Sequence, residues 1–145
     1  GTMIVFGIFV SACFLLHVVG ANPLLEEIIA DDRVRVVEFY SAMCGSCTEF
    51  APKWAQLERK LGSVVTSKIN IDEKDGMDLA QKIGVLDEGL PNIRLFSSSK
   101  ADVANKGVSI MPGTEMSPKE IWGKLKDSVK DLTKRDDGFY LKSNS

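Results

Sequence analysis

Two cysteines separated by two residues, Cys44 and Cys47, form the pair in this sequence whose spacing best fits chemistry. They follow a run of β-branched and aromatic residues that predicts a buried strand, and they open a pattern typical of an amphipathic helix. Free backbone N–H groups and the helix dipole at a helix N-terminus favour a thiolate over a thiol. The spacing therefore predicts a redox pair in which Cys44 attacks a disulfide. Cys47, one turn later and more buried, would resolve the mixed disulfide.

Other uses of this cysteine pair fit the sequence less well. The chain has three cysteines and one histidine, and two of these, Cys13 and His17, lie in an apolar N-terminal run. A zinc site with four ligands is therefore not expected, and no metal site is predicted. A purely structural bridge over two intervening residues would constrain the unfolded chain little. Two reduced core cysteines would not need to stand at the start of a helix.

The composition indicates one globular domain with no strong field of a single sign. The chain has 145 residues, of which 44% are hydrophobic, and its formal net charge is −2. This balance argues against a protein whose main partner is nucleic acid or an anionic membrane surface.

Alternating helical and strand patterns define the elements that must position the two cysteines. Ser117 and Glu120 have the spacing of a capping box before the last helix. The element order predicts an α/β domain over residues 22–132, with a central mixed β-sheet of four to five strands and helices on both faces. The expected helices cover residues 23–30, 44–61, 77–83 and 118–132. The expected strands cover residues 34–40, 64–72, 92–96 and 107–111. Residues 133–145 are expected to be a polar tail.

The N-terminal segment has the features of a targeting sequence. Residues 1–2 are interpreted as an expression scar before Met3, and residues 3–21 resemble a signal peptide cleaved after Gly20 or Ala21, although no Lys or Arg precedes the apolar run. A membrane anchor and a first strand at residues 14–19 are the alternatives. A signal peptide predicts the secretory pathway, with the endoplasmic reticulum lumen as the expected compartment, although no retention signal is seen. An uncleaved segment is expected to cause self-association, with no specific membrane role.

The residues around the cysteine pair resemble a known family. The sequence resembles the thioredoxin superfamily, and most closely the catalytic domains of protein disulfide isomerases, at residues 37–47, at the Phe50–Ala51–Pro52 segment and at Trp54. It resembles later motifs of that superfamily at residues 78–81, 84–85 and 89–93. The resemblance implies a thioredoxin fold and a thiol–disulfide oxidoreductase that forms, reduces or isomerises disulfides. No cofactor beyond the Cys44–Cys47 disulfide is implied. The implied partners are folding polypeptides with cysteines, and glutathione or another thiol.

The same resemblance suggests roles for residues around the cysteines. Pro91 would be the family's cis-proline and would bind substrate with Met43 and Leu90; a trans turn proline is the alternative. Glu38 matches a buried carboxylate that relays a proton for Cys47. Its alternative is a side chain whose tip reaches water at the edge of the sheet.

Within the motif, Gly45 lets a substrate backbone approach closely, and Ser46 departs from the family pattern. Ser46 stands where isomerases have His and thioredoxins have Pro. Two further departures are Met43, where the family has Trp, and Thr114, where isomerases have Arg. Without a His beside the nucleophile, the dithiol form is expected to be less favoured, and the pair less oxidising, than in an isomerase domain. A thioredoxin-like reductant and a chaperone or adaptor with little redox turnover remain the alternative functions.

Overall fold

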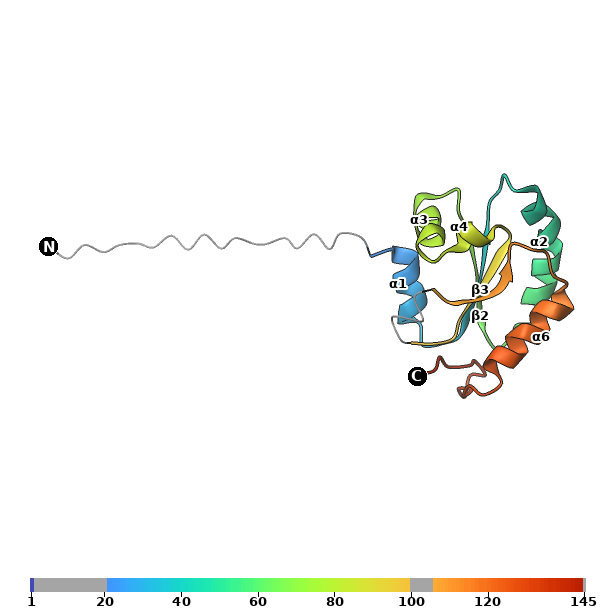
Figure 1. Cartoon of the computed structure of the whole chain (residues 1–145). Helices are drawn as coiled ribbons and strands as arrows, with labels where there is room; N and C mark the ends of the chain where they lie inside the picture. Colours follow the sequence, from blue (N-terminus) through green and yellow to red (C-terminus); the bar gives the residue numbers. More distant parts are fainter. Residues whose placement is uncertain (2–20, 100–105, 145) are drawn as a thin grey trace.

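The computed structural model describes residues 1, 21–99 and 106–144 (Figure 1). The hypotheses of a signal peptide, an anchor or a first strand concern residues 3–21, which apart from Ala21 lie outside the described residues. In the part of the chain that the structure describes, no helix is long and apolar enough to cross a membrane.

A mixed four-stranded sheet lies at the centre of the domain, in the order β2-β1-β3-β4. The inner strand β1 pairs in parallel with β2 and antiparallel with β3, and β3 pairs antiparallel with β4. Because β1 and β3 have helices over both faces, nearly all their residues are buried, as expected for covered inner strands. The strands are β1 (Arg35–Tyr40), β2 (Val65–Asn70), β3 (Asn92–Phe96) and β4 (Val108–Pro112).

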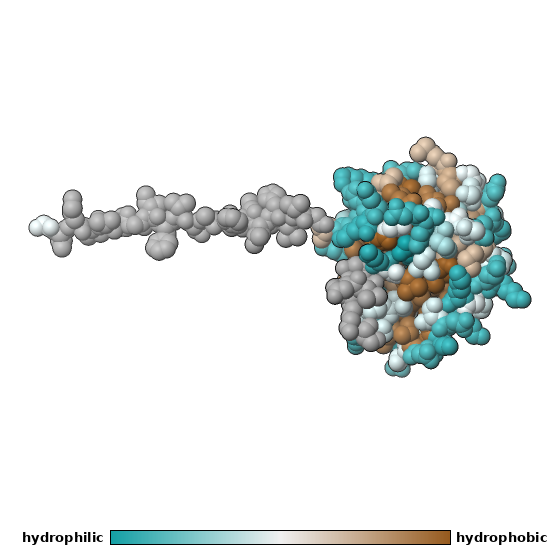
Figure 2. Space-filling model, viewed as in Figure 1, coloured by the Kyte–Doolittle hydropathy of each residue, from teal (hydrophilic) through white to brown (hydrophobic). Residues whose placement is uncertain are grey.

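Helices cover both faces of this sheet and divide the core in two (Figure 1). One face carries α1 (Pro23–Ala30), α3 (Lys74–Lys82) and the short α4 (Val85–Glu88); the other carries α2 (Gly45–Glu58) and α6 (Pro118–Val129). Figure 2 shows a mainly hydrophilic surface from this side, with hydrophobic residues gathered over the middle of the molecule. The predicted α/β architecture, a mixed sheet of four to five strands with helices on both faces, is confirmed, and the sheet has four strands.

The region between β2 and β3 differs from the sequence prediction. Helix α3 begins at Lys74, three residues before the predicted start, and α4 was not predicted. Gly76 lowers the helical propensity of the first turn, but a glycine is needed there because a Cβ would lie 2.1 Å from the Asn70 carbonyl oxygen. Close packing of α3 on the end of β2 therefore decides the start of this helix.

Residues 133–144, which we call the C-terminal strap, pack against the domain, whereas the sequence predicts a polar tail. The Tyr140 N–H donates to the Ser63 carbonyl at 2.9 Å, and the Tyr140 carbonyl accepts from the Val34 N–H at 2.8 Å. Further along, the Lys142 N–H donates to the Asp32 carbonyl at 2.8 Å. The strap is held largely by backbone hydrogen bonds, which its polar composition does not reveal.

The buried end of the strap gives a stability prediction. Lys142 is buried, its ammonium donates to the Ile28 and Asp31 carbonyls, and desolvation lowers its pKa. Lys142→Met leaves both carbonyls without this donor, so the free energy of unfolding in urea should fall by about 1–3 kcal/mol. The exposed control Lys130→Met should change it by less than about 0.5 kcal/mol. Equal effects of the two substitutions would contradict the stabilising role of the Lys142 ammonium.

Candidate active site

Cys44 caps the N-terminus of α2, where its sulfur meets free backbone donors. Its Sγ accepts a hydrogen bond from the Cys47 N–H at 3.2 Å, and its side chain is partly exposed. Burial raises the pKa of the Cys44 thiol, but hydrogen bonds from Cys47 and Ser46 outweigh this effect, and the pKa is lowered overall. This environment favours a thiolate at an accessible position.

Ser46 places a hydroxyl between Cys44 and the loop before β3. Its Oγ lies 3.2 Å from the Cys44 Sγ and donates to the Leu90 carbonyl at 3.4 Å. A serine has one hydroxyl proton, so it can serve only one of these acceptors at a time. A charged acceptor forms the stronger bond, and the hydroxyl should therefore turn to the sulfur when Cys44 ionises.

Cys47 lies one turn further into α2 and is buried, with 4% of its surface exposed. Burial, followed by the hydrogen bond to Cys44, raises the pKa of the Cys47 thiol to about 11. The two thiols therefore differ in acidity in the order that attack by Cys44 requires. A proton acceptor is needed before Cys47 can react in turn.

Glu38 carries a carboxylate that is buried beneath α2 on the inner strand β1. It points to the same face of the sheet as Val36, and only 1% of its surface is exposed. The alternative of a side chain reaching water at a sheet edge is therefore wrong. Burial raises the pKa of Glu38 to about 7, although Lys68 opposes this shift.

Lys68 forms an ion pair with Glu38. It is the β2 register partner of Glu38, and its Nζ lies 3.6 Å from the Glu38 Oε2, which has no hydrogen-bond partner among the described residues. The same ammonium lies 4.5 Å from the centre of the Tyr40 ring. Lys68 remains 39% exposed, so the carboxylate is paired with a cation in contact with solvent.

A cavity of about 190 Å³ joins the acid to the buried thiol. Both Glu38 and Cys47 line it, and Lys68 and Thr48 line it as well. Its walls are mainly apolar, but the Glu38 carboxylate and the Thr48 hydroxyl supply polar groups, and the volume can hold a water between the thiol and the carboxylate.

Asp72, which follows β2, holds the turn before the cysteines. Its carboxylate accepts from the Ser41 hydroxyl at 2.6 Å and from the Ala42 N–H at 2.8 Å. The Ser41 Oγ in turn accepts from the Met43 N–H at 3.1 Å. These bonds set the direction in which the chain enters α2.

An exposed apolar side chain, Met43, precedes Cys44, and the loop of Leu90 and Pro91 lies near Ser46. The Leu90–Pro91 peptide is cis, so the trans alternative is wrong. Pro91 is buried, Leu90 is partly exposed, and Met43 is 86% exposed. A Cβ added at Gly45 would meet no atom within 4 Å, which leaves room for a substrate backbone.

Sequence reasoning missed two residues of this site, Lys68 and Asp72. Lys68 occupies an ordinary polar position in an alternating strand, and only the parallel register of β1 and β2 brings it to Glu38. Asp72 lies two residues beyond the end of β2, on the side where the neighbouring strand β1 also ends, a position that could have drawn attention to it. In the described ranges, no three His, Cys, Asp or Glu residues are grouped to hold a metal ion.

Comparison with known proteins assigns the family. The family model described as Thioredoxin matches residues 16–116, which is more than half of the chain. The chain belongs to the thioredoxin family. Domains of this family use a redox-active cysteine pair, need no external cofactor, and act on cysteine-containing protein substrates.

Thioredoxins and protein disulfide isomerases both occur among its relatives. The chain is 33% identical over 92 residues to thioredoxin of Rhodospirillum rubrum, covering 63% of this chain and 83% of that protein. It is 35% identical over 76 residues to the protein disulfide-isomerase A6 homolog of Drosophila melanogaster, and the match covers 52% of this chain and 17% of that protein. It matches 64% of the thioredoxin of Geodia cydonium at 31% identity, covering 50% of this chain. The match therefore spans only a small part of the isomerase.

Solved structures support the same fold. The Trx4 domain of ERdj5 aligns with a TM-score of 0.60 at 22% identity, covering 78% of this chain and 95% of that one. The first thioredoxin domain of mouse protein disulfide-isomerase A4 aligns with a TM-score of 0.53 at 25% identity, and the alignment covers 83% of this chain and 79% of that domain's chain. The thioredoxin fold expected from the motifs is thus confirmed.

Ser46 offers a direct test of how the thiolate is stabilised. Ser46→Ala removes the hydroxyl near the sulfur, and the pKa of Cys44 should rise. Alkylation of Cys44 at neutral pH should slow about tenfold or more, as expected for the loss of one hydrogen bond to a charged group, which contributes about 1.5–3 kcal/mol. Iodoacetamide labelling followed by mass spectrometry measures this rate. The exposed control Ser128→Ala on α6 removes a hydroxyl far along the chain from the sulfur and should leave the rate as it is. An unchanged rate in Ser46→Ala would leave only the backbone donors as the source of the lowered pKa.

Proposed function

We propose that this protein is a thiol–disulfide oxidoreductase of the secretory pathway that acts on folding polypeptides with cysteines. The observation that carries the proposal is the unequal environment of the two thiols. Cys44 is accessible and has a lowered pKa, whereas Cys47 is buried beside Glu38 and has a raised pKa. The apolar N-terminal run and the isomerase relatives support the secretory location.

The reaction proceeds in two exchanges. The Cys44 thiolate attacks one sulfur of a substrate disulfide, forming a mixed disulfide and releasing a substrate thiolate that takes up a proton. Glu38 accepts the Cys47 proton, directly or through a water, and the Cys47 thiolate then attacks the Cys44 sulfur. The second substrate thiolate leaves and is protonated. The substrate gains two electrons, and Cys44 and Cys47 become a disulfide.

Substrate oxidation is the reverse of this sequence, and a small thiol such as glutathione resets the pair. A substrate segment would lie over Met43 and against the loop of Leu90 and Pro91, where the nucleophile is open. Ser46 replaces the His of isomerases, which favours a reduction potential between about −270 mV and about −180 mV.

Turnover assays test the proposal. The reduced protein should accelerate insulin reduction by dithiothreitol, and in a glutathione buffer it should speed the recovery of active ribonuclease from its scrambled form. A glutathione titration gives the potential, and Ser46→His should raise it. Activity on insulin alone, with a potential near about −270 mV, would instead favour a thioredoxin-like reductant.

The exposed Met43 favours a second candidate, a polypeptide-binding adaptor. That function predicts peptide binding in a double variant, Cys44→Ser with Cys47→Ser, that equals binding to the unaltered protein. It also predicts no turnover in either assay.

A further inference from the structure

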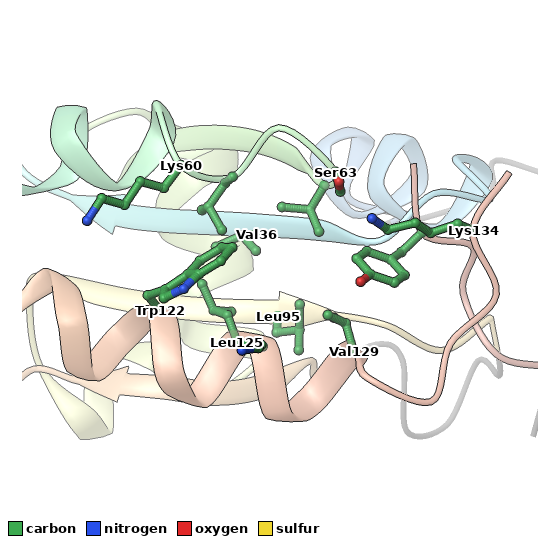
Figure 3. Close-up of a pocket in the computed structure, with 12 residues that line it drawn as sticks. Val36, Lys60, Ser63, Leu95, Trp122, Leu125, Val129 and Lys134 are labelled. Atoms are coloured by element: carbon green, nitrogen blue, oxygen red, sulfur yellow. The ribbon is translucent and has the colours of Figure 1, made fainter. Parts of the chain in front are cut away.

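An apolar groove lies between α6 and the sheet, at the end of the sheet opposite the cysteines (Figure 3). Val36 of β1 and Leu95 of β3 form its floor, and Leu125 and Val129 of α6 form one wall. Val36 comes four residues before the end of β1, a distance of about 13 Å along the strand, and Cys44 follows that end. We call this site the α6 groove. None of the residues that line it belongs to the active site.

Three lysines give the α6 groove a positive rim. Lys60, Lys126 and Lys134 line it, and no carboxylate does, although the whole chain has 20 acidic residues against 18 basic ones. In the described part of the chain, none of these three ammonium groups has a carboxylate within ion-pair distance; the Lys134 Nζ lies 4.7 Å from the centre of the Tyr140 ring. The local charge is therefore opposite in sign to that of the protein and is not neutralised by neighbours.

Both ends of the α6 groove are formed in the folded chain. Tyr140 of the C-terminal strap is fixed by backbone hydrogen bonds to Ser63 and Val34. At the other end, Trp122 is 37% exposed and lies near Lys60 (Figure 3). A preformed groove does not have to be ordered by its ligand, so less of the binding free energy is lost.

The size of the α6 groove limits what it can hold. Its volume is about 230 Å³. Pockets for drug-sized ligands begin at about 300 Å³, so a body of one ring or a short alkyl chain fits better than a larger molecule. The apolar floor favours such a body, and the lysines favour a negative head group and disfavour a positive one.

We propose that the α6 groove binds a small amphiphilic anion, with its carboxylate or sulfonate at the lysines and its apolar body against Val36, Leu95 and Leu125. This is a binding site separate from the redox site. It does not depend on the proposed function, and a ligand there need not touch the cysteines.

Three probes of equal chain length test the proposal: octanoate, octan-1-ol and octylammonium. We expect octanoate to saturate the full chain with a Kd of about 1 mM or tighter, to change the fluorescence of Trp122, and to shift the NMR methyl signals of Val36, Leu95 and Leu125. Octylammonium should bind at least about tenfold more weakly than octanoate. The signals of the active-site residues should stay in place in both redox forms.

Two matched triple variants separate the groove from the overall charge. The first triple variant replaces the three groove lysines, Lys60, Lys126 and Lys134, with Gln. It should weaken octanoate binding about tenfold and leave octan-1-ol binding unchanged. The control changes Lys74, Lys82 and Lys106 to Gln, which removes the same charge away from the groove, and it should bind octanoate like the unaltered protein. Equal affinity for octanoate and octylammonium, equal weakening by both triples, or no saturable shift of the groove methyls would each overturn the proposal. Insulin reduction and the recovery of scrambled ribonuclease measure the redox function independently of octanoate binding.

Discussion

Replacing Cys44 with serine should lower the rate of insulin reduction by about a thousandfold or more. A serine hydroxyl is not ionised at neutral pH and cannot form the mixed disulfide, so no later step can occur. Cys47→Ser should also stop turnover, but after the first attack. That variant should accumulate a covalent complex with substrate through Cys44, seen as a band on a non-reducing gel that dithiothreitol removes.

The third cysteine provides a matched control for these substitutions. Cys13→Ser exchanges the same side chain in the N-terminal run, and turnover should be unchanged. If Cys44→Ser trapped substrate and Cys47→Ser did not, the assignment of attacking and resolving residues would be reversed.

Glu38→Gln should make the protein more stable at pH 8 by about 2–3 kcal/mol while slowing the second exchange. The pKa of Glu38 is about 7 in the folded chain and about 4.5 in an ordinary setting, so the folded state holds the proton more tightly. Stability from this group is fully present below about pH 4.5 and is lost as the pH rises through 7. The difference of about 2.5 pKa units corresponds to about 3 kcal/mol.

Glutamine has nearly the same shape and stays neutral, so it avoids this loss at high pH. Lys68 would lose its partner, but its ammonium is exposed enough for water to replace the carboxylate. Urea unfolding of the reduced proteins should therefore give equal stabilities near pH 4.5 and separate them at pH 8. The exposed control Glu49→Gln on α2 should show no such separation. Equal curves for Glu38→Gln and the unaltered protein at both pH values would mean that the pKa of Glu38 is ordinary.

Glu38→Gln should also affect the rates of the two exchange steps differently, because the first step uses Cys44 and the second uses Cys47. Alkylation of Cys44 should stay nearly intact, because Glu38 lies beside Cys47 and the stabilising hydrogen bonds of Cys44 come from α2. Release of the mixed disulfide should slow about 100-fold, the usual range for loss of a positioned proton acceptor. Normal release would make Glu38 a structural residue only. A gain in stability with a loss of rate would mean that the buried acid is kept for its chemistry.

Local features of the fold follow from the sequence because neighbours in the chain decide them. Ser117 and Glu120 form the predicted capping box at the start of α6. The apolar stripe of α2 and the β-branched run of β1 are buried as their periodicity indicates. The position of Cys44 at a helix N-terminus has the same local origin. By contrast, the start of α3 and the packing of the strap depend on contacts with distant segments, Asn70 and Ser63.

For function, the sequence by itself determined the cysteine pair, its family and the presence of an acid in a buried strand. Tertiary structure decided what each group experiences. The side-by-side register of β1 and β2 brings Lys68 to Glu38, and the return of the chain at Leu90 brings a carbonyl to Ser46. The α6 groove likewise needs β1, β3, α6 and the strap together. The physical reason is that a pKa depends on burial and on charges within a few ångströms, and sequence separation does not report such distances.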